Sequence, residues 1–331
     1  MAVMHRTDGK VWRLSIRAVL ALALAWLSFA ASAQTYPART VRIIVGYTPG
    51  SPSDSVARVL AQNLGTTWGQ PVVVENRPGA GGNIGSELVA KSEPDGYTLL
   101  LTASGPIVVN VSLFGKLPFD PIRDFAPVTM VYLTPTALYV QASLPVNSVS
   151  DLIAYIKSRP GKLNYSTTGE GTPLHLAAEM LKQRAGLDVV HIAYKGGPEM
   201  TAAVLSGEVT FNFNGLIAMP LVRAGKLKAL GVATLQRSPL APDVPTIAES
   251  GLPGFDVNAW GGLFVPARTP KEIVAKLHDD VVKGLADVGV RTRLTGLGVE
   301  PVGNSSEEFA KQIRSEIPRW AQVIKLAGIR I

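Results

Sequence analysis

The stretch Val41–Leu64, VRIIVGYTPGSPSDSVARVLAQNL, decides the fold. Its first five residues form a hydrophobic run that favours a β-strand, and glycine, proline and serine residues then favour a loop. A helical pattern follows, because apolar residues recur at spacings of three, four and eight: Val56, Val59, Leu60 and Leu64. We expect Gly65 to end this helix in a left-handed conformation. The stretch therefore predicts a strand, a loop and a helix in succession.

The loop of this unit, Tyr47–Asp54, has the composition of a small anion receptor. Either Ser53 or Asp54 would accept a hydrogen bond from the first free N–H groups of the helix. The other free N–H groups, the partial positive charge of the helix end and the backbone of Gly50 and Ser51 would then attract a negative group. An ordinary strand-to-helix connection has the same pattern, so this stretch alone leaves both interpretations open.

The composition is that of a globular chain long enough for two domains, with 331 residues, of which 47% are hydrophobic and 17% charged. The chain contains no cysteine, which excludes disulfides, thiol catalysis, thiolate metal sites and lipid attachment at the N-terminus. Its basic residues form no block and do not alternate with aromatic ones. We therefore expect no nucleic-acid partner.

Residues 1–33 have the organisation of a cleaved signal peptide. Basic residues precede an apolar core, Val19–Ala30, and the small residues Ala31-Ser32-Ala33 stand before Gln34. An uncleaved membrane anchor is the alternative, but the apolar run is short for a membrane span. We expect cleavage after Ala33 and export to a bacterial periplasm. Loss of the four Lys/Arg residues and one Asp of this segment would lower the net charge from +7 to +4.

The rest of the chain alternates strands and helices in two series. Residues 41–104 read β, α, β, α, β, which is typical of a parallel sheet covered by helices. The alternation restarts at Ser150, after two extended runs that flank Pro135, and the extended run 260–266 would return the chain to the first series. We predict two lobes joined by two crossovers: residues 34–134 with 257–331, and residues 135–256.

Two more polar segments follow strands and are candidate binding loops. Thr102, Ala103 and Ser104 come at the carboxyl end of a strand, where ligands bind in open α/β sheets. The second series repeats the strand–loop–helix unit of the first, with the loop TTGEG at 167–171 and a helix that has Thr172 as N-cap. Two such units, one in each lobe, indicate paired anion receptors that face each other across a cleft.

The glycine-rich segment GAGGNIG, residues 79–85, has the composition of a nucleotide-binding loop but not its pattern. The dinucleotide fingerprint needs glycine where this chain has Ile84, and the Gly-Lys-Ser/Thr sequence of a P-loop is absent. We interpret the segment as a loop that packs tightly against a helix, and we expect no cofactor.

Several sequence motifs occur in the following order along the chain: Tyr47-x-Pro49-Gly50-x-x-x-Asp54, Glu75-Asn76-Arg77-Pro78-Gly79-Ala80-Gly81-Gly82, Pro94-Asp95-Gly96-Tyr97-Thr98-Leu99, Asp120-Pro121-x-x-Asp124-Phe125-x-Pro127, Ser166-Thr167-x-Gly169-x-Gly171-Thr172 with His175-Leu176, Tyr194-Lys195-Gly196-Gly197, and Trp260-Gly261-x-x-x-x-Pro266-Ala267-x-Thr269-Pro270. With these motifs the chain resembles the periplasmic substrate-binding proteins of tripartite tricarboxylate transporters, the Bug-type receptors. The similarity covers nearly the whole mature chain, and the combination of motifs is highly specific.

The resemblance implies an α/β, two-lobed periplasmic-binding-protein fold of type II, in which each lobe is a mostly parallel sheet flanked by helices and the ligand cleft lies between the lobes. It also implies a ligand that carries carboxylates, bound by backbone N–H groups, hydroxyls and waters from loops of both lobes. The ligand-binding residues carried over from the resemblance and the loops above are Tyr47, Thr48, Pro49, Gly50, Ser51, Ser53, Asp54, Thr102, Ala103, Ser104, Thr168, Gly169, Gly171, Thr172 and His175.

As a Bug-type receptor, the protein would be a monomer that captures a di- or tricarboxylate, an aromatic acid or an acidic amino acid. It would deliver this ligand to the membrane components of a tripartite tricarboxylate transporter. A receptor that presents its ligand to a membrane sensor kinase is the alternative among binding functions. The sequence leaves open which carboxylate is bound.

Two positions depart from the family pattern. Ser51 stands where the family usually has a second glycine, so it adds a hydroxyl donor and restricts the backbone. The segment Thr210–Asn214 carries Thr and Asn where acidic residues are common. This loss of negative charge would suit an anionic ligand, or it would reflect drift at the surface.

An exported hydrolase is the alternative from another class, but the chain contains neither G-x-S-x-G nor H-E-x-x-H. We interpret His278 as a surface residue and His191 as structural. His175 is either a ligand contact or plain helix surface. Asp54 either touches an amino or hydroxyl group of the ligand or only caps the helix, and Lys195 either pairs with a ligand carboxylate or is solvated. We expect no catalysis and no metal site.

Overall fold

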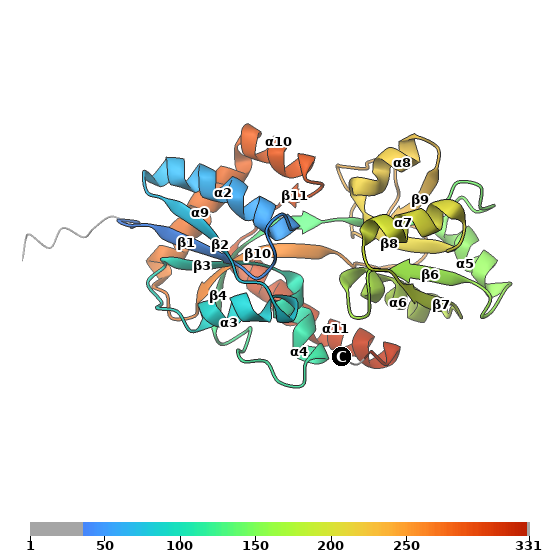
Figure 1. Ribbon diagram of the computed structural model, residues 1–331, viewed down its shortest axis with the longest axis horizontal. Helices are drawn as coiled ribbons and strands as arrows, with labels where there is room; N and C mark the ends of the chain where they lie inside the picture. Colours follow the sequence, from blue (N-terminus) through green and yellow to red (C-terminus); the bar gives the residue numbers. More distant parts are fainter. Residues whose placement is uncertain (1–35, 330–331) are drawn as a thin grey trace, which may run out of the picture. The chain divides into compact units, whose positions relative to one another are not determined.

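The computed structural model describes residues 36–329, and the predicted signal peptide with its cleavage site lies outside this part of the chain. The strands of the described part are β1 (Val41–Val45), β2 (Val72–Asn76), β3 (Thr98–Ala103), β4 (Phe125–Thr134), β5 (Thr136–Gln141), β6 (Asn164–Thr167), β7 (Val190–Ala193), β8 (Phe211–Gly215), β9 (Leu227–Val232), β10 (Ala259–Pro266) and β11 (Glu300–Pro301). Figure 1 shows these strands together with the helices.

The helices of the described part are of several kinds. The α-helices are α2 (Pro52–Trp68), α3 (Asn83–Ala90), α4 (Asn110–Leu113), α5 (Val149–Lys157), α6 (Pro173–Ala185), α7 (Gly197–Ser206), α8 (Met219–Arg223), α9 (Lys271–Ala286), α10 (Val288–Gly296) and α11 (Ser306–Ala327). Two short 3₁₀ segments, η1 (Ala80–Gly82) and η3 (Leu216–Ala218), and one π-helical segment, η2 (Gly105–Val109), connect them to the strands.

The strands of residues 36–329 form two mixed sheets. Sheet A has the order β11-β4-β10-β3-β1-β2, and sheet B has the order β7-β6-β8-β5-β9. In sheet A, β1 pairs in parallel with β2 and β3, whereas β10 runs antiparallel to β3 and β4. In sheet B, β6 pairs in parallel with β7 and β8, whereas β5 runs antiparallel to β8 and β9. The predicted α/β architecture of two sheets flanked by helices is confirmed, and each sheet adds antiparallel strands to its parallel part.

The first strand–loop–helix unit forms as predicted, but both ends of its helix differ from the prediction. Helix α2 begins at Pro52, because the side chain of Ser51 accepts a hydrogen bond from the N–H of Asp54 and acts as N-cap. It continues past Gly65 and ends at Gly69, which has the left-handed conformation. The last turn is held from outside, since Nε1 of Trp68 in this turn lies 2.6 Å from the carboxyl group of Asp280 in α9.

Two backbone segments connect the sheets. Strand β4 runs into β5 with only Pro135 between them, and the chain returns from sheet B to sheet A through residues 233–258. The two segments are bonded to each other, because Ala233 N–H donates to the carbonyl of Thr136 and the Thr136 hydroxyl donates to the carbonyl of Val257. From Thr40 onward the chain is one compact unit by its contacts. Its division into the two lobes given above therefore stays a prediction.

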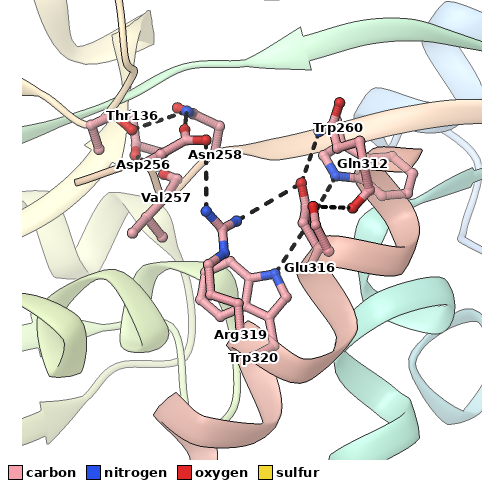
Figure 2. Close-up of polar contacts among 11 residues, drawn as sticks. Thr136, Asp256, Val257, Asn258, Trp260, Gln312, Glu316, Arg319 and Trp320 are labelled. Carbon is pink, nitrogen blue, oxygen red and sulfur yellow. Dashed lines mark hydrogen bonds and ion pairs between the residues drawn. The ribbon is translucent and has the colours of Figure 1, made fainter. Parts of the chain in front are cut away.

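The C-terminal helix α11 is tied to the returning segment by a buried polar network, shown in Figure 2. Glu316 accepts hydrogen bonds from the indole N–H groups of Trp260 in β10 and Trp320 in its own helix. Arg319 lies between Glu316 and Asp256, at 3.8 and 3.6 Å from their carboxyl oxygens. Burial raises the pKa of Asp256 in spite of this cation. Side chains of helix α11 thus contact Asp256 in the returning segment and Trp260 in β10.

Candidate functional site

The loop after β1 is organised by the start of α2. Ser51 has an extended backbone and its side chain receives the N–H of Asp54 at 3.3 Å, so Ser51, rather than Ser53 or Asp54, is the N-cap. Pro52 occupies the first helical turn, where its missing N–H costs nothing. Gly50 has a φ of 82°, a conformation that glycine adopts without strain.

Asp54 is buried and its carboxylate is fully engaged inside the protein. It accepts hydrogen bonds from Gly50 N–H at 2.9 Å, from Asn76 Nδ2 at 2.9 Å and from the guanidinium of Arg58. Burial alone would raise its pKa, but the hydrogen bonds from Arg58, Gly50 and Asn76 outweigh burial and hold the pKa below its ordinary value. Asp54 therefore does not act as the N-cap, and its carboxylate holds the loop. Its contact with a ligand stays a prediction.

The predicted receptor made of the Gly50 and Ser51 backbone needs a correction. Gly50 N–H is used by Asp54, and Ser51 N–H donates to the carbonyl of Thr48 at 3.2 Å. In the described part of the chain, the N–H groups of this loop that have no hydrogen-bond partner are those of Tyr47, Thr48 and Ser53, and the last of these lies in the first turn of α2. The hydroxyl groups of Thr48 and Ser51 also donate to no other described residue, and Thr48, like Pro49, is exposed.

The end of β3 lies beside this loop, because β1 and β3 are parallel neighbours. Thr102 is fully buried, and its hydroxyl oxygen makes no hydrogen bond of good geometry with the described residues. Burial raises the pKa of Tyr47, and the nearby Thr102 hydroxyl opposes this effect. The predicted residues Tyr47 and Thr102 therefore do lie together, and Ala103 and Ser104 continue the same edge of sheet A.

A residue that the sequence analysis did not predict also contacts this group. The hydroxyl of Tyr132, in strand β4 of sheet A, lies 2.8 Å from the hydroxyl of Ser53. Burial raises the pKa of Tyr132 to about 12. No sequence signal marks Tyr132, because it belongs to a strand that reaches the loop only through the sheet order β4-β10-β3-β1.

The glycine-rich segment packs against the same loop, which confirms its interpretation as a packing element. A Cβ on Gly46 would lie 2.7 Å from the carbonyl oxygen of Gly82, and a Cβ on Gly82 would lie 3.1 Å from the Tyr47 hydroxyl. A Cβ on Gly85 would lie 2.8 Å from the Cα of Gly46. The Tyr47 hydroxyl also donates to the carbonyl of Gly81 at 3.4 Å. The glycines thus permit a close approach of two backbones and place the Tyr47 ring.

The loop after β6 has the predicted cap. Thr172 is the N-cap of α6, and its side chain receives the N–H of His175 at 3.3 Å while its hydroxyl donates to the carbonyl of Gly169 at 2.8 Å. Gly169 N–H donates to the hydroxyl of Thr167, a residue of this loop that was not among the predicted site residues. Gly169 and Gly171 both have positive φ, at 124° and 70°. Thr168 is half-buried, and its hydroxyl bonds to no other described residue.

His175 is neither plain helix surface nor an exposed contact residue, since only 4% of it is exposed. Its Nδ1 accepts a hydrogen bond from Gly171 N–H at 3.0 Å. Its ring stacks on that of His191 with 4.2 Å between the centroids, and Nε2 of His191 lies 2.6 Å from the Thr167 hydroxyl. Burial, together with the neighbouring His191, lowers the pKa of His175 to about 4. His191 is the second residue of β7, and its structural role is to support the loop through Thr167.

Three other interpretations are also resolved. Asn212 is buried and donates to a backbone carbonyl of α7, and Asn214 donates to the hydroxyl of Thr201 in the same helix. These amides therefore serve the packing of α7, rather than a ligand or a drifting surface. Lys195 is exposed, which agrees with a solvated charge. His278 is half-buried, with its Nε2 3.2 Å from the carbonyl oxygen of Asn304, so it is not a plain surface residue.

The predicted site residues thus fall into two groups, one at the end of β1 and β3 in sheet A and one at the end of β6 in sheet B. Within residues 36–329, no hydrogen bond or ion pair links one group to the other, so their meeting across a cleft stays a prediction. No cluster of three metal-ligating side chains occurs in the same part of the chain. None of its helices is both long enough and apolar enough to span a bilayer.

Comparison with known proteins identifies the family. Residues 56–329 match the model of the tripartite tricarboxylate transporter family receptor. The chain belongs to this family. Protein BugT of Bordetella pertussis is 37% identical to it over 312 residues, which cover 94% of this chain and 96% of BugT.

Two solved structures of relatives from Rhodopseudomonas palustris are also similar. Rpa4515, solved with adipate, is 36% identical, with a TM-score of 0.74 over 89% of this chain and 99% of that one. MatC, solved with bound malate, is 36% identical, with a TM-score of 0.69 over 87% of this chain and 100% of that one. These similarities confirm the periplasmic-binding-protein fold and the resemblance to Bug-type receptors. The chain is therefore a receptor of the periplasmic binding protein class, and not an enzyme.

Proposed function

We propose that this receptor captures a small carboxylate between the loop Tyr47–Asp54 and the loop Thr168–Thr172. The observation that carries the proposal is the repetition of one arrangement in both sheets: a strand, a loop with a positive-φ glycine, a hydroxyl N-cap and a proline in the first turn of a helix. Each helix presents its positive end to the loop. A cleft between the two lobes would bring these ends to the two sides of one ligand.

Each loop has hydrogen-bond donors without a partner in the described part of the chain, and such donors can bind a carboxylate. In each of the two loops the N–H in the helical turn after the proline has no partner among the described residues: that of Ser53 in α2 and that of Leu174 in α6. Backbone N–H groups at a helix N-terminus bind anions, because the orphan donors and the helix dipole act together. The hydroxyls of Ser51 and Thr168 add donors beside them.

Two such receptors fit a ligand with two carboxylates. The relatives solved with adipate and with malate were bound to dicarboxylates, which agrees with this number. Lobe closure around the ligand would stabilise the closed form through contacts that are absent in the open form. We therefore propose a dicarboxylate as the ligand class of this receptor.

The first experiment is a titration of the purified protein with adipate, malate and the diamide of adipate, followed by thermal unfolding and calorimetry. A ligand at 100 times its Kd should stabilise the protein by about 2.7 kcal/mol. We expect a saturable shift with at least one of the two acids and none with the diamide. Equal shifts with adipate and its diamide, or no shift with any small carboxylate, would contradict the proposal.

The second experiment assigns the site. Ser51→Ala combined with Thr172→Ala removes one N-cap hydroxyl from each proposed loop, whereas Ser148→Ala combined with Ser305→Ala removes the caps of α5 and α11. Each lost cap costs about 1 kcal/mol of stability, so the two double variants should be destabilised alike. Only the first should bind the carboxylate at least tenfold more weakly, since a hydrogen bond to a charged group contributes about 1.5–3 kcal/mol. Equal affinity in both double variants would reject these loops as the site.

We further propose that the protein acts in the periplasm after cleavage behind Ala33, and that it delivers its ligand to the membrane components of a tripartite tricarboxylate transporter. The family membership supports the partner, and the pattern of residues 1–33 supports the export. Sequencing the N-terminus of protein isolated from the periplasm should begin at Gln34. A periplasmic protein that retains its first residues would refute the cleavage.

A further inference from the structure

The two binding loops share a five-residue pattern that runs from the loop into the helix. Residues 50–54 read Gly-Ser-Pro-Ser-Asp, and residues 171–175 read Gly-Thr-Pro-Leu-His. Both segments thus have a glycine, a hydroxyl residue, a proline, a variable residue and a hydrogen-bond acceptor. The pattern differs in the acceptor, which is a carboxylate in the first loop and an imidazole in the second.

The hydrogen bonds of the two segments are the same. In each, the hydroxyl side chain accepts the N–H of the fifth residue, at 3.3 Å in both loops. The fifth side chain in turn accepts the N–H of the glycine, at 2.9 Å for Asp54 and at 3.0 Å for His175. The two glycines have similar positive φ angles, 82° and 70°. Asp54 and His175 therefore do the same structural work, since each fixes the glycine that precedes the N-cap.

The charge that each side chain brings to its helix end is different. Asp54 places a carboxylate beside the N-terminus of α2, and Arg58 pairs with it from one turn further along the helix. His175 can accept from Gly171 N–H at Nδ1 only when that nitrogen carries no proton, so the imidazole is neutral. At this shared position, an anion at the first loop meets a carboxylate, which Arg58 pairs with, whereas an anion at the second loop meets a neutral ring. The acidic residue of the second loop is Glu170, which is exposed.

The neighbours of His175 keep this imidazole neutral. His191 of β7 stacks on one face, and Tyr165 of β6 lies parallel to both rings. The charged groups that face the pair are Glu179 and Lys182 of α6 and Glu170 of the loop.

Glu179 and Lys182 form an ion pair with each other, and His191 also makes a hydrogen bond within the protein. Glu179 receives the Tyr165 hydroxyl at 2.6 Å and the Lys182 ammonium at 3.1 Å, so its charge is balanced away from the imidazoles. His191 reaches the Thr167 hydroxyl, which receives Gly169 N–H. Protonation of either ring would place a cation against its stacked partner, and the ring of His175 is buried.

We propose that Asp54 and His175 are matched positioning residues, which hold the two loops through the same hydrogen bond, and that the neutral imidazole makes the Thr168–Thr172 loop the stronger of the two anion sites. His191 supports His175 by holding Thr167. This inference rests on the proposed carboxylate function for its second part only. The first part concerns hydrogen bonds that are present in the ligand-free protein.

The first test is nuclear magnetic resonance of the ligand-free protein with ¹⁵N-labelled histidine. We expect the Nδ1 signal of His175 to show an unprotonated, hydrogen-bonded nitrogen from pH 7.5 to pH 5. In His175→Asn the amide oxygen can replace Nδ1, so slow hydrogen exchange of Gly171 N–H should persist, whereas His175→Phe should lose it by at least tenfold. A protonated Nδ1 at pH 7, or equal exchange rates in the Asn and Phe variants, would overturn the positioning role.

The second test is the affinity for adipate of three variants. His175→Asn should bind within about threefold of the unchanged protein. His175→Asp gives the second loop the acceptor of the first; it should keep the slow exchange of Gly171 N–H but bind adipate at least tenfold more weakly, because a carboxylate now faces the anion. Thr292→Asp adds the same charge on the exposed face of α10 and should change the affinity less than twofold. Unchanged affinity in His175→Asp would overturn the assignment of the stronger site.

The pH dependence separates positioning from direct contact. A histidine that touched a ligand carboxylate would take up a proton on binding, so affinity relative to His175→Asn would rise as the pH falls from 7.5 to 5. A positioning histidine predicts a constant ratio over this range. A rise of tenfold or more in the ratio would overturn the proposal. Should neither adipate nor malate bind the unchanged protein, the proposed function fails while the exchange and ¹⁵N measurements still decide the positioning role.

Discussion

Glu316 in α11 accepts hydrogen bonds from the N–H groups of two buried indoles, so its removal should destabilise the protein strongly. Its Oε2 lies 3.0 Å from Nε1 of Trp260 and 3.4 Å from Nε1 of Trp320, and its Oε1 lies 2.8 Å from Nε2 of Gln312. The two indoles and the carboxyl group are each 5% exposed or less. Water therefore has little access to these donors.

The magnitude follows from the donors that would be left unpaired. Glu316→Ala removes the acceptor of two buried indole N–H groups, at about 1–3 kcal/mol each, and takes one partner from Arg319. We expect the free energy of unfolding to fall by about 3–5 kcal/mol, as for other broken buried pairs. Glu316→Gln retains an oxygen for the indoles and loses mainly the ion pair with Arg319. It should cost about 1 kcal/mol.

The assay is urea unfolding followed by tryptophan fluorescence and far-UV circular dichroism, since coincident transitions show whether a single free energy describes the change. Glu307→Ala is the matched control, because Glu307 is an exposed carboxyl residue in the first turn of the same helix. Its effect should stay near 0.5 kcal/mol. If Glu316→Ala lost no more stability than Glu307→Ala, the hydrogen bonds from the two indoles would contribute nothing measurable to the free energy of unfolding.

Three other changes test the packing, the titration and the capping. Gly46→Ala would place a Cβ within 2.7 Å of the carbonyl oxygen of Gly82, so thermal unfolding should show a loss of about 1–3 kcal/mol of stability. Gly115→Ala is the control, because nothing lies within 4 Å of its new Cβ, and its stability should stay near that of the unchanged protein. The pKa of His175 is lowered from 6.5 to about 4, so between these pH values the native state binds fewer protons than the unfolded state. Up to about 3 kcal/mol of stability, present above pH 6.5, should therefore be lost as the pH falls to 4. Urea unfolding should show a shallower loss over this range in His175→Asn. Ser305→Ala breaks the capping box of α11 and should cost about 1 kcal/mol in urea unfolding, and a cost near zero would mean that water replaces the cap.

The fold could be predicted where short-range pattern decides it. The hydrophobic run of β1 and the Thr172–Pro173 start of α6 were both predicted from a few neighbouring residues, and both are confirmed. The predicted end of α2 was wrong, because a contact with a residue distant in sequence determines where this helix ends. The bond from Trp68 to Asp280 in α9 extends the helix past Gly65, which carries no signal of that partner. The short helix α10 was missed because its apolar residues follow no helical period.

The sequence predicted which loops form the candidate site, but not which of their atoms are available to a ligand. The hydroxyls and glycines of the two loops identify where an anion receptor could form, since these residue types favour helix caps and positive φ. Which N–H groups stay available depends on side chains one turn along the helix, such as Asp54, and no single position reveals this. The stacking of His175 on His191 depends on the parallel register of β6 and β7, in which Tyr165 pairs with His191. Such a register is not readable from either strand alone.

The repeated segment also explains why the N–H groups of Gly50 and Gly171 are not available as anion donors. A left-handed glycine turns its N–H back toward the helix, where the side chain in the first turn captures it. What remains for a ligand in both loops is the N–H of the residue after the proline and the helix dipole, and in the first loop the Ser51 hydroxyl as well. The charge of that acceptor is then free to vary without disturbing the loop. Asp54 and His175 occupy the same position with different charges, and this asymmetry would orient an anionic ligand toward α6.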